Sequence, residues 1–175
     1  MFLIVKFILL ITVFLVSTAI GFFISNRFSE RVKELEDLIT ALELFETKIS
    51  YTYDSLIDTF TYISENLKTK IYRIFFITAE HLRECKNLSA GEVFRNVIEE
   101  EKIFLELNKK DVEIIKSLSV SLGQVDLEAQ LKNINLVSNL LNTQLKESYE
   151  EKSKNFKIYR NMGVLTGLVL IILLI

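Results

Sequence analysis

The stretch VKELEDLITALELFETKI, residues 32–49, carries the pattern that decides the fold. Its apolar residues recur at steps of three and four, which places them on one face of an α-helix and leaves the charged residues largely on the other. An amphipathic helix of this kind contributes its apolar face to a hydrophobic core. The residues expected on that face are Val32, Leu35, Leu38, Ile39, Leu42, Phe45 and Ile49.

Toward the N-terminus the helix can continue into a long apolar segment. Between residues 2 and 24 only Lys6 carries a charge. A helix of that length is about 35 Å long, enough to cross the ~30 Å hydrocarbon core of a bilayer. We predict an N-terminal transmembrane helix over residues 1–25. A cleavable signal peptide, with residues 17–19 as its cleavage site, is the alternative, but the apolar run continues past that site.

A second apolar segment covers residues 161–175. As a helix its apolar run is about 21 Å long, which is shorter than the hydrocarbon core. One interpretation is a half-inserted tail. We favour a complete span, because residues 158 and 159 can extend the helix while Lys157 and Arg160 reach the lipid headgroups.

Basic residues follow the first apolar segment and precede the second. Because positively charged flanks stay on the cytoplasmic side of a membrane, they predict that the middle of the chain, residues 26–160, is cytoplasmic. The flanking basic residues are Arg27, Arg31, Lys33, Lys152, Lys154, Lys157 and Arg160.

The middle of the chain is predicted to be an all-α, compact bundle of about five or six helices between the two apolar helices. The sequence has no proline and five glycines, and no run alternates in the period of two that a half-buried strand requires. Breaks near Tyr51, Asn87 and Gly123 argue against one extended coiled coil.

Capping signals divide this bundle into helices. Asp54 is a candidate N-cap, Ser89 and Glu92 have the spacing of a capping box, and Asn108 begins another helix. The last and longest helix is expected to start at Asp126, after Gly123 in a left-handed C′ conformation. Further core residues predicted from helical spacing are Phe60, Ile63, Ile71, Phe75, Phe94, Val112, Ile115, Leu118, Leu122, Ile134 and Leu141.

Residues that carry chemistry are scarce, and the sequence predicts no catalytic, cofactor or metal site. His81 and Cys85 are one helical turn apart and resemble half of a dyad or a zinc site, but a packed cysteine beside a histidine is the simpler interpretation. Residues 99–101, three glutamates, point in different directions on a helix, so we expect a solvated edge. The chain is therefore expected not to be an enzyme, and to bind neither nucleic acid nor a small-molecule substrate.

The terminal apolar segment contains two glycines four residues apart. Gly163 and Gly167 form a small-xxx-small pair, a spacing that lets another membrane helix approach closely. We predict these residues as a helix contact within the membrane.

Several short motifs in order and spacing resemble the stage III sporulation protein AB family. They are Gly21-Phe22, Ser29-Glu30-Arg31, Glu46-Thr47-Lys48-Ile49-Ser50-Tyr51 and Leu122-Gly123-Gln124-Val125-Asp126 with Gln130, followed by the hydrophobic C-terminal end. The likeness covers nearly the whole chain. Lys48 departs from the acidic residue usual in the family.

The resemblance implies a mother-cell membrane component of the secretion-like channel that joins mother cell and forespore. It also implies a helical domain similar to the cytoplasmic domains of type II secretion and type IV pilus inner-membrane platform proteins. By that analogy the bundle docks the stage III sporulation ATPase and contacts other channel components. Contact is expected at Glu46, Thr47, Ser50, Tyr51, Gln124, Asp126 and Gln130. A membrane-anchored helical adaptor unrelated to secretion is the alternative function.

Overall fold

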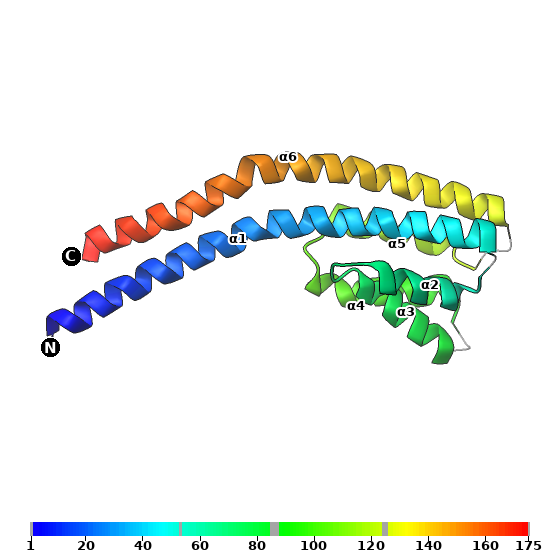
Figure 1. Ribbon diagram of the computed structural model, residues 1–175, viewed down its shortest axis with the longest axis horizontal. Coiled ribbons are helices and arrows are strands. Elements are labelled where there is room, and N and C mark those ends of the chain that lie inside the picture. The colour runs from blue at the N-terminus through cyan, green and yellow to red at the C-terminus, as the bar shows by residue number, and fades with distance from the viewer. Residues whose placement is uncertain (1, 53, 85–87, 124–125, 175) are drawn as a thin grey trace. The chain divides into compact units, whose positions relative to one another are not determined.

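The computed structural model describes residues 2–52, 54–84, 88–123 and 126–174, without the side chains of residues 2–5, 52 and 174. In this part of the chain all regular structure is helical, which confirms the all-α prediction (Figure 1). The helices are α1 (Phe2–Thr47), α2 (Leu56–Asn66), α3 (Tyr72–Glu84), α4 (Ala90–Glu101), α5 (Lys109–Ser117) and α6 (Leu127–Leu174). A short π-helix, Lys48–Thr52, follows α1 and is called the π-turn below. Short 3₁₀ helices, called 3₁₀ turns, follow α4 (Lys102–Phe104) and α5 (Leu118–Val120).

The chain divides into two compact units. Residues 31–147 form a helical bundle, while residues 1–30 and 148–175 form a helical hairpin.

Four phenylalanines form the centre of the helical bundle. Phe45 of α1, Phe60 of α2, Phe75 of α3 and Phe94 of α4 are fully buried, and neighbouring ring centroids lie 5.5–6.0 Å apart. Each such ring removes a large apolar surface from water, and ring pairs at this spacing add to that stabilisation. Four helices are thus fixed to one another by residues that the helical periodicity had already assigned to the core.

The predicted helix starts are confirmed at three positions. Ser89 and Glu92 form a reciprocal capping box at α4, and Asn108 forms a second box with Asp111 at α5. Asp126 accepts hydrogen bonds from the backbone N–H groups of residues 128 and 129 at the start of α6. These side chains satisfy amide groups that the first turn of a helix leaves without partners.

One predicted cap is wrong. Ser55, not Asp54, caps α2, because the hydroxyl of Ser55 accepts the backbone N–H of Asp58. The carboxylate of Asp54 instead pairs with Lys48 at 2.9 Å, which ties the π-turn to the start of α2. Gly123 has φ of 79°, as predicted, although a 3₁₀ turn separates it from the end of α5. Asn87 and Cys85 lie outside the described residues.

Gly91 permits a close approach between α4 and the 3₁₀ turn after α5. A Cβ atom at this position would lie 2.1 Å from the carbonyl oxygen of Ser119. Because the obstacle is backbone, no side-chain rotation would relieve the contact. A glycine is therefore required here by packing rather than by its backbone angles.

The helical hairpin exposes apolar side chains on its outer surface. α1 and α6 are both long and apolar enough to cross a membrane by length and composition. In a water-soluble protein so large an apolar surface would be unusual. The most exposed of these side chains are Phe7, Leu9, Leu15, Phe23, Leu165, Ile172 and Leu173.

Candidate functional site

The end of α1 forms the first predicted contact surface. Thr47 and Ser50 lie at the change from α-helix to π-turn, and Tyr51 is 81% exposed. Such π-turns often occur at functional sites because they re-aim side chains at the cost of regular helical bonding. The turn is held from one side by Lys48, whose ammonium group lies 4.2 Å from the ring centroid of Tyr62.

The second predicted corner, at the start of α6, lies beside the first. Asn135 of α6 donates a hydrogen bond of 3.4 Å to the carboxylate of Glu46 in α1, and Figure 1 shows the end of α1 next to the start of α6. Asp126 is exposed at this corner. Gln130 is buried, and Gln124 lies outside the described residues.

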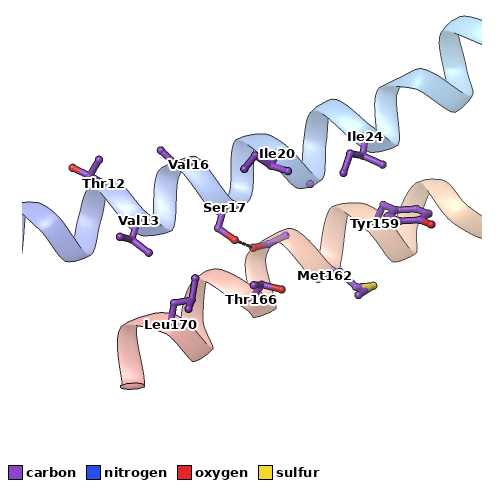
Figure 2. Close-up of a pocket in the computed structure, with 12 residues that line it drawn as sticks. Thr12, Val13, Val16, Ser17, Ile20, Ile24, Tyr159, Met162, Thr166 and Leu170 are labelled. Atoms are coloured by element: carbon purple, nitrogen blue, oxygen red, sulfur yellow. Dashed lines mark hydrogen bonds between the residues drawn. The ribbon is translucent and has the colours of Figure 1, made fainter. Parts of the chain in front are cut away.

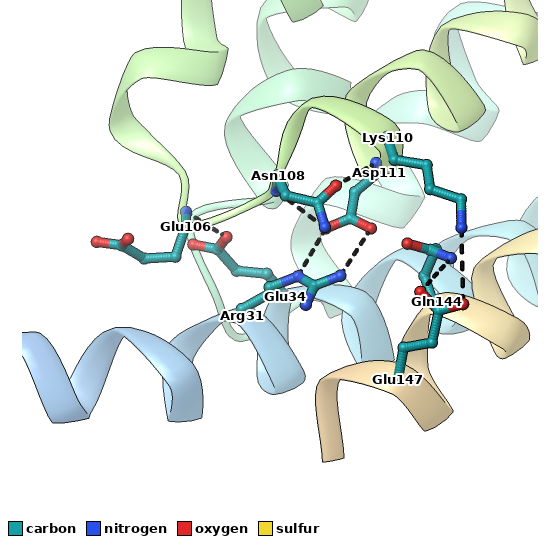
Figure 3. A network of polar contacts seen from close by, with 8 residues as sticks. All are labelled: Arg31, Glu34, Glu106, Asn108, Lys110, Asp111, Gln144 and Glu147. Carbon is teal, nitrogen blue, oxygen red and sulfur yellow. Dashed lines mark hydrogen bonds and ion pairs between the residues drawn. The ribbon is translucent and has the colours of Figure 1, made fainter. Parts of the chain in front are cut away.

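The sequence had not indicated the buried ion pair between Arg31 and Asp111. The guanidinium of Arg31 donates two hydrogen bonds, of 2.8 and 3.1 Å, to the carboxylate of Asp111, and both side chains are buried (Figure 3). The same carboxylate accepts the backbone N–H of Asn108 in the capping box. Arg31 therefore neutralises a buried charge of the bundle, in addition to its predicted place in the basic flank.

Two other acidic residues of α1 hold loops of the bundle. Glu34 is buried and accepts the backbone N–H of Glu106 at 2.7 Å. One carboxylate oxygen of Asp37 accepts the backbone N–H groups of Lys68 and Thr69, which lie before α3. Charged residues of an amphipathic helix are usually expected on its solvent-exposed face, so helical periodicity did not predict these contacts.

Two of the three glutamates at the end of α4 have different environments. Glu99 is exposed and pairs with Lys102 and Lys116; hydrogen bonds from these two amines lower its pKa to about 2. Glu101 is buried and pairs with Arg73, so the predicted solvated edge is wrong at this residue. The carboxylate of Glu101 in turn raises the pKa of Arg73 above its ordinary value.

Among the described residues no group of three His, Cys, Asp or Glu side chains is placed to hold a metal ion. His81 is half-buried near the end of α3, and Cys85 is outside the described residues. The bundle's polar contacts described above join helices and loops to one another.

The helical hairpin has its own point of close contact, where glycine faces glycine and Ser17 of α1 points toward α6 (Figure 2). A Cβ atom on Gly163 would lie 2.8 Å from the Cα atom of Gly21, and the hydroxyl of Ser17 donates a 2.9 Å hydrogen bond to the carbonyl oxygen of Gly163. Gly167 faces Phe14 of the same chain. Small residues and interhelical hydrogen bonds of this kind let membrane helices approach closely.

Comparisons with known proteins agree with this architecture. The sequence model of the family described as stage III sporulation protein AB matches residues 6–175. Stage III sporulation protein AB of Bacillus subtilis (strain 168) is 27% identical over 158 residues, which cover 90% of this chain and 92% of that protein. A solved structure of stage III sporulation protein AB has a TM-score of 0.67 at 22% identity and covers 71% of this chain and 98% of its own. The chain therefore belongs to the stage III sporulation protein AB family.

Proposed function

We propose that this protein is a non-enzymatic membrane platform of a secretion-like sporulation channel between mother cell and forespore. In this role it docks a cytoplasmic ATPase and couples it to the membrane assembly. The observation that carries the proposal is the family match over residues 6–175, together with a helical bundle joined to two helices long and apolar enough to span a bilayer.

The proposed topology places both apolar segments in the mother-cell membrane and residues 31–147 in the cytoplasm. Support comes from the basic residues that flank the two segments, among them Arg27, Lys33, Lys157 and Arg160. An exposed, largely apolar hairpin is also what a bilayer requires, since lipid takes the place of a protein core around it.

The proposed docking surface is the corner formed by the end of α1 and the start of α6, with Glu46, Thr47, Tyr51 and Asp126 as contacts. Tyr51 is its central candidate because exposed tyrosines concentrate binding energy in protein interfaces. Two contacts hold the corner in place: Lys48 of the π-turn packs over the ring of Tyr62, and Asp126 caps the start of α6. A preformed surface loses little conformational entropy on binding.

The test measures binding of the purified stage III sporulation ATPase to the full-length chain in lipid nanodiscs. Tyr51→Ala should weaken binding by roughly thirtyfold, corresponding to a hot-spot loss of about 2 kcal/mol. Tyr72→Ala removes another exposed tyrosine, on α3, and should leave affinity unchanged.

If both variants bind the ATPase as tightly as the wild type does, the docking surface lies elsewhere on the bundle. If the wild-type chain shows no affinity for the ATPase, the platform role fails, and a membrane-anchored adaptor becomes the better account. Sporulation frequency of a deletion strain complemented with each variant provides the matching measurement in cells.

A further inference from the structure

The helical hairpin contains an open groove between its two helices (Figure 2). The groove has a volume of about 610 Å³, within the ~300–1,000 Å³ range of small-molecule sites. On α1 it runs from Thr12 to Ile24, a distance of about 18 Å along a helix. On α6 it runs from Leu170 back to Tyr159.

We propose that this groove holds an acyl chain of an anionic phospholipid whose headgroup is bound by Arg160. The inference rests on the membrane insertion proposed above. It adds a ligand of stated chemistry to the hairpin, with the chain along the groove and the headgroup at its Tyr159 end.

The groove walls suit a flexible chain better than a further protein helix. A third helix would need small residues for close approach, and the hairpin uses these internally: Gly21 faces Gly163, and the hydroxyl of Ser17 is bonded to the carbonyl of Gly163. The remaining walls are mostly branched or long apolar side chains, which conform to an acyl chain. These walls include Val13, Val16, Ile20, Ile24, Met162 and Leu170.

The charge at one end of the groove favours an anionic headgroup. Phe28 and Tyr159 stack with ring centroids 5.6 Å apart, at the end of the groove that Ile24 and Tyr159 line. Arg160 directly follows Tyr159 and is exposed, and its guanidinium lies 5.6 Å from the ring centroid of Phe156. Basic residues beside grooves between membrane helices attract anionic lipid headgroups, and tyrosines concentrate at the same level of the bilayer.

The test uses tryptophan fluorescence, because the natural sequence contains no tryptophan. Leu170→Trp places a reporter in the groove, and Leu168→Trp places one outside it, about 3 Å away along the same helix. Both leucines are exposed, so neither substitution needs space in a core. Met162→Trp is a second groove reporter if the first disturbs helicity measured by circular dichroism.

Each full-length variant is placed in vesicles that contain a minor fraction of either brominated phosphatidylglycerol or brominated phosphatidylcholine, both of which quench tryptophan on contact. We expect the groove reporter to be quenched about fivefold more effectively by phosphatidylglycerol. The outside reporter should not distinguish the two lipids. In the Arg160→Gln background the preference should disappear, whereas the matched Lys157→Gln background should retain it, because Lys157 lies on the opposite face of α6 from Tyr159.

Three outcomes would overturn the inference, and they differ from one another. Equal quenching by both lipids at both positions means that the groove meets only bulk lipid. Quenching of the outside reporter without quenching of the groove reporter means that a protein segment fills the groove. Absence of quenching at both positions means that the hairpin is not in the bilayer, and the membrane insertion fails together with the lipid site.

Discussion

At the scale of single residues, the Arg31–Asp111 pair is a buried contact that joins α1 to α5. Arg31→Met removes the countercharge of the buried Asp111 carboxylate, and Asp111→Asn removes the charged carboxylate with which Arg31 pairs. Each change should lower the free energy of unfolding by about 3–5 kcal/mol. The double variant should lose much less than the sum, because apolar or neutral replacement of both partners removes the uncompensated charge.

Denaturant unfolding of the full-length chain in detergent, followed by circular dichroism, measures this cycle. The exposed Lys110–Glu147 pair serves as the control, and Lys110→Met should cost less than about 1 kcal/mol. Additive losses in the double variant would show that the two buried charges do not stabilise each other.

A second prediction at this scale concerns pH and Glu99. Hydrogen bonds from Lys102 and Lys116 lower its pKa from 4.5 to about 2 in the folded chain. Above pH 4.5 the carboxylate is charged in both folded and unfolded chains, so its stabilising contribution is fully present. As the pH falls from 4.5 toward 2, the unfolded chain takes up a proton first, and the contribution is lost.

Glu99→Gln removes this contribution. The thermal midpoint of wild type should therefore exceed that of the variant at neutral pH, and the two should converge near pH 2. A difference that stays constant across this range would mean that the paired amines do not favour the charged carboxylate. An NMR titration of the Glu99 side chain gives the pKa directly.

At the scale of helices, Gly91 of α4 packs against the 3₁₀ turn Leu118–Val120. This contact reverses the usual effect of replacing a helical glycine by alanine. Alanine in place of a helical glycine normally stabilises a helix by about 1 kcal/mol. At Gly91 the added Cβ would meet the carbonyl oxygen of Ser119 at 2.1 Å. Gly91→Ala should therefore destabilise the bundle by about 1–3 kcal/mol, the range for overpacking.

The comparison variant for this helix is Ser89→Ala, which removes the capping hydroxyl of α4 and should cost about 1 kcal/mol. Thermal unfolding of both variants by circular dichroism separates loss of the cap from the backbone collision. A rise in the midpoint of Gly91→Ala would show that α4 and the turn are farther apart than the structure has them.

At the scale of the whole molecule, the two proposed membrane spans would place both ends of the chain on the same side of the bilayer. In spheroplasts of non-sporulating cells that express the chain, epitope tags at residues 1 and 175 should both be digested by added protease, while a tag inserted between Lys102 and Ile103 should be protected. The basic flanks are the physical reason for this orientation. Protection of the C-terminal tag with digestion of the N-terminal one would indicate a single span and a half-inserted tail.

Local chemistry explains the parts that could be predicted from the sequence. Helical periodicity placed Phe45, Phe60, Phe75 and Phe94 in the core, because a helix that buries one apolar face repeats its apolar residues at a spacing that can be seen in the sequence. The capping box at Ser89 and the helix start at Asn108 were equally predictable, since a cap satisfies amides only two or three residues away.

The sequence by itself therefore determined the helices, most of their starts, the core residues and the two apolar segments, all of which depend on short-range patterns. Only the tertiary structure decided that Arg31 meets Asp111, 80 residues away, and that Glu101 is buried against Arg73. It likewise decided that Gly163 faces Gly21. A charged or small residue has the same local signature whether it faces solvent or a partner, and the folding of distant segments against one another selects between the two.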